Sequence, residues 1–161
     1  MHSVGDYVIY RKEVCEIIGI KEKVFDDKNY YVLVPVNDKS LKLQVPIEDN
    51  PYLRDLVSKE EIEKVIEMIP EIEVINTTEK LIENEYKKLM NSGSFEDLIK
   101  IIKTTYLRNQ NRLENNRKIS EKDEQYFNKA EKLLYTEFSM VLNKSYDETK
   151  EYIVNKVEKE M

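Results

Sequence analysis

The sequence predicts an α+β protein of two domains, a small SH3-like or Tudor-like β-barrel followed by a compact all-α domain. A two-residue apolar period runs to about Pro46, and a helical period takes over from Ser58. In addition, five Ser or Asn residues each stand three positions before an acidic residue, a pattern typical of helix N-termini. We place the boundary within residues 51–58, which gives predicted domains of residues 1–56 and 57–161.

Short runs of β-branched and aromatic residues predict the strands of the first domain. The expected strands are residues 4–10, 14–20 with a continuation over 21–25, 30–36 and 41–45. In the last run, alternate residues from Leu41 to Val45 are expected to face the core, and Lys42 and Gln44 to face outward. Strands this short and evenly spaced are typical of a small, strongly bent barrel, with bends at Gly5 and Gly19.

Five amphipathic helices are expected in the second domain, because each apolar run begins at a capping pair. The pairs are Ser58 with Glu61, Asn76 with Glu79, Ser94 with Asp97, Ser120 with Asp123, and Ser145 with Glu148. Pro70 is expected to stop the first helix and Gly93 to end the second. Helices of this length are unstable alone in water, so together they predict one packed helical domain of residues 57–161.

Composition and charge argue against several classes of function. With 26 Lys and Arg against 32 Asp and Glu, the net charge of -6 argues against nucleic-acid binding through bulk charge, so any DNA contact has to be local. Cys15 is the only cysteine and His2 the only histidine, which disfavours disulfides, zinc clusters and histidine-based catalysis. The absence of a long apolar run or signal peptide favours a cytoplasmic protein. We therefore expect no enzyme, no cofactor, no small-molecule substrate and no membrane partner.

The stretch from Lys100 to Lys118, which includes most of the third expected helix, carries a local excess of positive charge, with six basic residues against the single acid Glu114. The basic residues are Lys100, Lys103, Arg108, Arg112, Arg117 and Lys118. Counted at 100° per residue, the apolar side of this helix holds Phe95, Leu98, Ile102, Tyr106 and Leu113. We therefore expect the basic side to point away from the core. A solvated face that complements the helix dipole is favoured on periodicity alone, and a face that tracks nucleic-acid phosphates is the alternative.

Two groups of motifs give the chain a family resemblance. It opens with Val4-Gly5-Asp6-Tyr7-Val8-Ile9-Tyr10, and its helical half contains Arg108-Asn109-Gln110, Ile119-Ser120-Glu121-Lys122-Asp123, Lys129-Ala130-Glu131-Lys132-Leu133-Leu134 and Glu137-Phe138-Ser139. In order and spacing over nearly the whole chain, these segments resemble the CarD/CdnL family of bacterial transcription regulators. The resemblance implies a Tudor-like module, shared with transcription-repair coupling factors, that binds the RNA polymerase β subunit. It also implies a helical domain that reaches promoter DNA near the upstream edge of the melted region.

The resemblance further implies two sets of contact residues in a monomeric, non-enzymatic regulator. Polymerase contact, with an edge strand added to the partner's sheet, is expected through Lys21, Lys23, Val24, Phe25, Lys42 and Gln44. DNA contact, weak and non-specific in the free protein, is expected through Thr78, Lys80, Lys100, Lys103, Arg108 and Arg112.

Three positions depart from the family pattern. Arg11-Lys12-Glu13 stands where relatives usually have a Pro and a His-Gly pair, and Gln44 stands where some relatives present an Arg. Thr78 aligns with a Trp that relatives use as a wedge against the DNA minor groove, and this chain has no Trp. The alternative function is a polymerase-independent protein–protein adaptor without DNA contact. A catalytic domain is disfavoured, because no acid–base, nucleophile or metal motif is visible.

Overall fold

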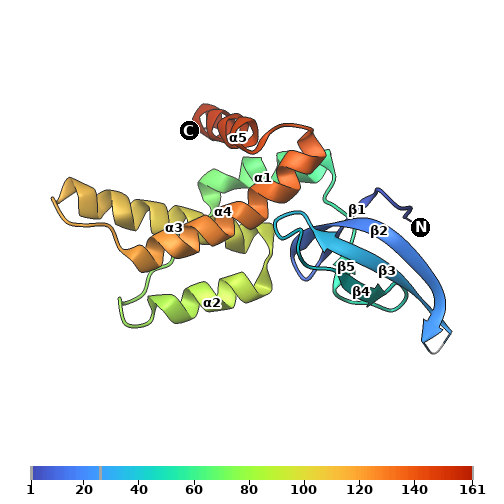
Figure 1. Ribbon diagram of the computed structural model, residues 1–161. Coiled ribbons are helices and arrows are strands. Elements are labelled where there is room, and N and C mark those ends of the chain that lie inside the picture. Colours follow the sequence, from blue (N-terminus) through green and yellow to red (C-terminus); the bar gives the residue numbers. More distant parts are fainter. Residues whose placement is uncertain (1, 26, 161) are drawn as a thin grey trace. The chain divides into compact units, whose positions relative to one another are not determined.

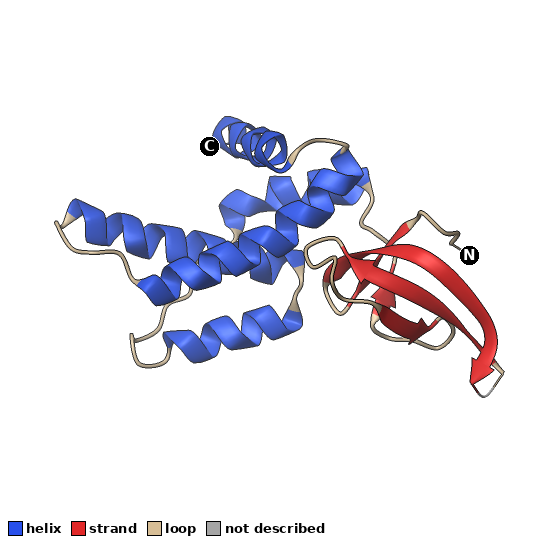
Figure 2. Ribbon diagram, in the orientation of Figure 1, coloured by secondary structure: helices blue, strands red, loops and turns tan. Residues whose placement is uncertain are grey.

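The computed structural model describes residues 2–25 and 27–160, with the side chains of residues 24–25 and 157–160 outside that description. Within the described residues, five strands precede five α-helices, so the protein is α+β as the sequence predicts (Figure 1, Figure 2). Contacts between residues divide the chain into two compact units, one ending at Val57 and the other beginning at Ser58. Each unit is described by itself.

The first unit is built on one antiparallel sheet. Its strands are β1 (Tyr7–Tyr10), β2 (Glu13–Phe25), β3 (Lys28–Pro35), β4 (Leu43–Pro46) and β5 (Leu53–Arg54). They are ordered β4-β3-β2-β1-β5, so β4 and β5 are the two edges. In the described residues the sheet is therefore open, whereas the sequence predicts a barrel. The edge strands β4 and β5 have four and two residues and are not paired with each other.

Strand β2 is long and irregular, and it forms a curved hairpin with β3 (Figure 1). Ile17 pairs with Leu33 and Gly19 with Val32, so Ile18 is one extra residue on β2. A bulge of this kind increases the local bend and twist of a strand. A second shift in register lies between Lys21 and Phe25. The predicted bend at Gly19 is confirmed by the first of these shifts.

The core of the first unit follows the predicted alternation only in part. One cluster of buried side chains consists of Val8, Cys15, Ile17, Tyr31, Leu33 and Val45. Ile9 and Val14 are buried as well, next to Val8 and Cys15 in the sequence. Leu41 is a further exception, because it precedes β4 and is 44% exposed, so the prediction that it faces the core is wrong. Strand β5 was not predicted, since two residues are too few to show a period.

The second unit consists of helices with mostly predicted starts. They are α1 (Lys59–Met68), a 3-10 turn (Ile69–Glu71), α2 (Ile82–Ser92), α3 (Phe95–Glu114), α4 (Glu121–Leu142) and α5 (Tyr146–Glu160). Ser58, Ser94 and Ser120 each accept a hydrogen bond from the backbone three residues on, as predicted. Ser145 and Glu148 form a reciprocal capping box at α5. Gly93 ends α2 in the left-handed conformation.

The predicted cap at Asn76 is wrong. Helix α2 begins only at Ile82, with Leu81 at its N-cap and no side-chain cap. The carboxylate of Glu79, which was expected to complete a capping box, instead pairs with Arg108 and Arg112 of α3. An acidic residue that neutralises two arginines is not available to a helix terminus, so residues 72–78 lack regular secondary structure.

The predicted faces of α3 are wrong in part. Leu98 is buried as expected and Ile102 is half-buried, but Tyr106 is 55% and Leu113 is 58% exposed, and the polar Asn109 is buried instead. The helix is thus rotated from the expected orientation. The reason is that Arg108 and Arg112 of α3 pair with the buried Asp123 of α4, whereas a count of apolar residues places these arginines on the solvent side.

Candidate nucleic-acid interface

Polar side chains of α3 hold the connection between α1 and α2 in place. Lys103 Nζ donates to the carbonyl oxygens of Ile69 and Ile72, at 2.8 and 2.6 Å. Thr104 Oγ1 accepts from the backbone N–H of Ile75 at 3.0 Å. Together with the arginine pairs below, these contacts attach residues 69–79 to α3. We call Lys103, Thr104, Arg108 and Arg112 the α3 anchor residues.

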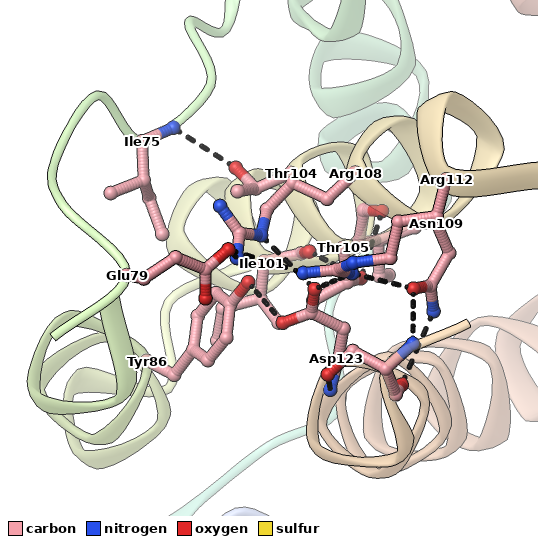
Figure 3. A network of polar contacts seen from close by, with 12 residues as sticks. Ile75, Glu79, Tyr86, Ile101, Thr104, Thr105, Arg108, Asn109, Arg112 and Asp123 are labelled. Atoms are coloured by element: carbon pink, nitrogen blue, oxygen red, sulfur yellow. Dashed lines mark hydrogen bonds and ion pairs between the residues drawn. The ribbon is translucent and has the colours of Figure 1, made fainter. Parts of the chain in front are cut away.

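A buried carboxylate lies at the centre of the polar contacts between α2, α3 and α4 (Figure 3). Asp123, with a side chain only 1% exposed, accepts through Oδ2 from Arg108 Nε at 3.0 Å and from Arg112 Nη1 at 2.6 Å. Its Oδ1 accepts from the hydroxyl of Tyr86 at 2.8 Å. Both oxygens of the acid are therefore paired, which is what burial of a charge requires.

The position of Asp123 follows from the start of α4. Ser120 caps this helix and accepts from the backbone N–H of Asp123 at 3.2 Å. Asn109, itself buried, accepts through Oδ1 from the Ser120 N–H at 2.8 Å and donates through Nδ2 to the Ser120 carbonyl at 3.4 Å. The same Oδ1 accepts from Arg112 Nη1 at 2.7 Å. One amide of α3 thus fixes both the first turn of α4 and an arginine.

Glu79 completes the arrangement, which we call the Asp123 cluster (Glu79, Tyr86, Arg108, Asn109, Arg112 and Asp123). A single oxygen of Glu79, Oε1, contacts Arg108 Nη2 and lies 3.2 Å from Arg112 Nη2. Its side chain is 74% exposed, whereas the two arginine side chains are 23% and 20% exposed. Two guanidinium groups and two carboxylates give the cluster a formal charge of zero.

Electrostatic shifts in the cluster agree with its geometry. Burial by itself raises the pKa of Asp123, but hydrogen bonds from Arg112, Tyr86 and Arg108 outweigh burial and lower this pKa overall. Burial likewise lowers the pKa of Arg108, and the hydrogen bond and charge of Asp123 raise it overall. The pKa of the Tyr86 phenol is raised, first by burial and then by the adjacent Asp123. The carboxylate is therefore ionised and the phenol neutral at pH 7.

The structure separates the residues expected to contact DNA into two groups. Lys103, Arg108 and Arg112 are engaged within the second unit. The prediction that the basic side of α3 points away from the core is therefore wrong for Arg108 and Arg112. Lys80 and Thr78 are exposed, and Lys100 is half-buried. Arg117 and Lys118, just past the end of α3, are exposed cations that were not among the expected contact residues, although they lie in the same basic stretch.

The residues expected to contact polymerase are exposed where they are described. Lys21, Lys23, Lys42 and Gln44 are exposed, and the side chains of Val24 and Phe25 lie outside the described residues. Lys21 pairs with Tyr30, and Gln44 pairs with Val32. Tyr30 and Val32 are two positions apart on β3, so Lys21 and Gln44 share the outer face of the sheet. Lys23 lies in the irregular part of β2, with a left-handed φ of 49°.

One exposed contact in the first unit, between an arginine and two tyrosines, was not predicted from the sequence. The guanidinium of Arg11 lies 5.5 Å from the ring centroid of Tyr10 and 4.6 Å from that of Tyr52. Arg11 and Lys12 form the β1–β2 turn with φ values of 47° and 74°, a geometry usually taken by Gly or Asn. Tyr52 lies outside the strands, so only the folded sheet brings it to the turn.

Metal and membrane features are not found in the part of the chain that the structure describes. No group of three or more His, Cys, Asp or Glu side chains there is placed to hold a metal ion. None of the described helices has the length and apolar character needed to cross a membrane. Comparison of the sequence with known protein-family models and with curated proteins gives no match.

Proposed function

We propose that this chain is a non-enzymatic bacterial transcription regulator of the CarD/CdnL type. Its first unit would be a Tudor-like domain that binds the RNA polymerase β subunit, and its second a helical domain that contacts promoter DNA weakly and without sequence specificity. The observation that carries the proposal is that residues of the motifs similar to the CarD/CdnL pattern make contacts that fix the local structure around them. The protein would act as a monomer in the bacterial cytoplasm, without a cofactor.

The opening motif illustrates this dependence. Gly5 has a φ of 97°, which residues with a side chain rarely adopt. The N–H of Gly5 donates to the carbonyl of Ile17 at 2.8 Å, and the carbonyl of Asp6 accepts from the N–H of Ile17 at 2.9 Å. The Asp6 carboxylate also accepts from the N–H of Ser3 at 2.9 Å. The Gly-Asp pair therefore sets the entry of the chain into the sheet.

The helical motifs have the same character. Arg108 and Asn109 belong to one motif, and Ser120 and Asp123 to the next. Three hydrogen bonds connect the two motifs, one from Arg108 Nε to Asp123 and two between Asn109 and Ser120. The cap bond from the Asp123 N–H to Ser120 lies within the second motif. The motif residues thus contact one another across α3 and α4, which supports reading them as parts of one pattern.

Polymerase binding is assigned to the sheet because it offers an edge strand with exposed polar neighbours. Strand β4 is an edge, and edge strands present unpaired backbone groups to a partner strand. Gln44 on β4 and Lys21 on β2 share the outer face beside this edge. The main chain of β4 would give affinity, and the exposed Lys21, Lys23, Lys42 and Gln44 would give specificity.

Titration calorimetry with the purified β subunit tests this assignment. The full-length protein should bind, and Lys23→Glu should weaken binding about tenfold, since reversing a charge at an interface costs on the order of 1–2 kcal/mol. Lys39→Glu is the matched control, because Lys39 is also exposed in the first unit but lies in the turn between β3 and β4. Absence of binding by the wild type would reject the polymerase assignment.

DNA contact is assigned to the exposed cations of the second unit. Lys80, Arg117 and Lys118 are exposed, and Lys100 is half-buried. A net charge of -6 opposes binding by the free protein. Tethering to polymerase would raise the local concentration of DNA, so individually weak phosphate contacts can suffice.

A second candidate function is a protein–protein adaptor that does not contact DNA. The observation that favours it is the engagement of Lys103, Arg108 and Arg112 in contacts within the second unit. Salt-dependent crosslinking of the polymerase-bound protein to promoter DNA distinguishes the two. Crosslinks from the second unit support the regulator, and their absence in a complex that still contains the β subunit supports the adaptor.

A further inference from the structure

We propose that Arg108 and Arg112 form a binding site for a phosphate oxyanion, and that Glu79 occupies this site as an internal competitor. A phosphate group would bind by displacing the Glu79 carboxylate. This inference rests on the DNA-contacting part of the proposed function, and it names the contact that the arginines make and the group that blocks it.

The geometry at Glu79 is that of a bound oxyanion. One carboxylate oxygen lies against Nη2 of both arginines, 3.2 Å from that of Arg112 (Figure 3). Guanidinium groups bind carboxylate and phosphate oxygens through the same N–H geometry. The position taken by Glu79 Oε1 is therefore one that a phosphate oxygen can take with the same two donors.

The two acids of the cluster have different roles because their burial differs. Asp123 is 1% exposed and binds Nε of Arg108 and Nη1 of Arg112, which orients both guanidinium groups. Glu79 is 74% exposed and binds Nη2 of each arginine. Asp123 thus positions the arginines, while only Glu79 lies where a ligand can approach from water.

Glu79 can leave without disturbing a helix or strand. It lies in the turn before α2, and the N–H of Ile75 remains bonded to Thr104 of α3 on its N-terminal side. On its C-terminal side the N–H of Leu81 donates to the carbonyl of Thr78. Rotation of an exposed glutamate side chain is therefore enough to open the site, and the backbone contacts can stay.

Charge balance explains why an acidic protein would keep such a site closed. With Glu79 in place the cluster is formally neutral, and with Glu79 displaced it carries +1, which matches a phosphodiester. A tethered carboxylate competes at an effective concentration in roughly the millimolar range. Free anions at low concentration would then be excluded, whereas a DNA phosphate held near the site by polymerase could displace Glu79.

The test compares binding of Glu79→Gln and wild type to a fluorescent 20-base-pair duplex by anisotropy. Glu79→Gln should bind about fivefold more tightly, the size expected when one exposed ion-pair competitor is removed. A plot of the logarithm of its binding constant against the logarithm of the salt concentration should also be steeper, by the amount expected for about one additional phosphate contact. Glu73→Gln is the matched control, because Glu73 is exposed in the same connection and the substitution changes the net charge equally.

A second measurement separates DNA from free phosphate. Inorganic phosphate is titrated into Glu79→Gln and Glu73→Gln while the Nε–H signals of Arg108 and Arg112 are followed by NMR. Shifts of both signals confined to Glu79→Gln support the site. If phosphate shifts both signals but Glu79→Gln does not bind DNA, the phosphate site is supported and the DNA-contacting part of the proposed function is rejected. If Glu79→Gln matches Glu73→Gln in both measurements, the arginines are purely structural and the inference is overturned.

Discussion

Asp123 shows how a single side chain can fix the packing of three helices. It is almost fully buried, and it receives hydrogen bonds from Arg108, Arg112 and Tyr86. A buried charge with this set of donors is stable only while the set is complete, since each lost partner leaves an uncompensated group. The residue is therefore a sensitive point of the second unit.

We expect Asp123→Asn to lower the free energy of unfolding by about 3 kcal/mol, because it leaves two half-buried guanidinium groups without their buried counter-charge. Urea unfolding followed by circular dichroism measures this change. Asp147→Asn is the control, since Asp147 also lies in the first turn of a helix but is exposed. It should lower stability by less than about 0.5 kcal/mol. Equal losses in the two variants would indicate only an interaction with the helix dipole.

The lowered pKa of Asp123 also predicts a dependence of stability on pH. Because this pKa is lower in the folded chain than in the unfolded chain, protonation favours the unfolded chain. The contribution of Asp123 is thus fully present above the ordinary aspartate pKa of about 4 and is lost as the pH falls through the lower folded value. The difference in stability between wild type and Asp123→Asn should shrink as the pH falls below about 4 into the acidic range. A difference that stays constant over this range would contradict the assigned ion pairs.

At the residue scale, the sequence identified Ser120 and Asp123 as a helix cap but not as the centre of a charge cluster. The cap is local, since its two residues are three positions apart. Arg108 and Tyr86 lie 15 and 37 positions from Asp123, and only the packing of α2, α3 and α4 brings them together. No periodic pattern in one segment encodes such a contact.

At the scale of whole elements, the helices likewise show that features set within one turn were predictable from the sequence and that contacts between distant segments were not. Four of the five predicted caps are confirmed, because a cap depends on residues within one turn. The predicted start of α2 was wrong and the predicted faces of α3 were wrong in part, because Glu79 and the α3 arginines pair across the fold rather than along the chain. Strand β5 was missed because its partner β1 lies about forty residues earlier, as the pairing of Ile9 with Arg54 shows.

Substitution of the two caps by alanine should separate the confirmed cap from the wrong one. Ser94→Ala should cost about 1 kcal/mol, because Ser94 accepts from the N–H of Asp97 at the start of α3. Asn76→Ala should change stability by less than about 0.5 kcal/mol, since Asn76 is exposed and precedes α2 by six positions. Thermal unfolding of the full-length protein measures both. A loss at Asn76 as large as at Ser94 would mean that α2 begins earlier in solution.

For the molecule as a whole, acidic charge and a missing aromatic wedge shape the expected action at promoters. The chain has a net charge of -6 and no Trp, and Thr78 is exposed where the resemblance places a Trp. A flat aromatic side chain can rest against an unstacked base step and offset an unstacking cost of a few kcal/mol. Under the proposed function, this protein would recruit or position polymerase more than it stabilises melted DNA.

Thr78→Trp should therefore lengthen the lifetime of open promoter complexes formed with cognate polymerase, by about threefold or more, since part of the unstacking cost is then offset. Asn76→Trp, which places the same side chain at another exposed position of the connection, should have no such effect. Heparin-challenge kinetics measure the lifetimes. If the two substitutions act alike, Thr78 does not occupy the wedge position.

The attachment of residues 69–79 to α3 has a consequence for the order of folding. The N–H of Ile75 and the carbonyls of Ile69 and Ile72 find partners on side chains about thirty positions later in the chain. The connection thus cannot acquire its native backbone until α3 has formed and docked, because closing a loop of that length precedes the contacts that stabilise it. We expect Thr104→Val to speed unfolding and to leave the folding rate almost unchanged in stopped-flow experiments, which would mark this connection as a late-forming part of the second unit.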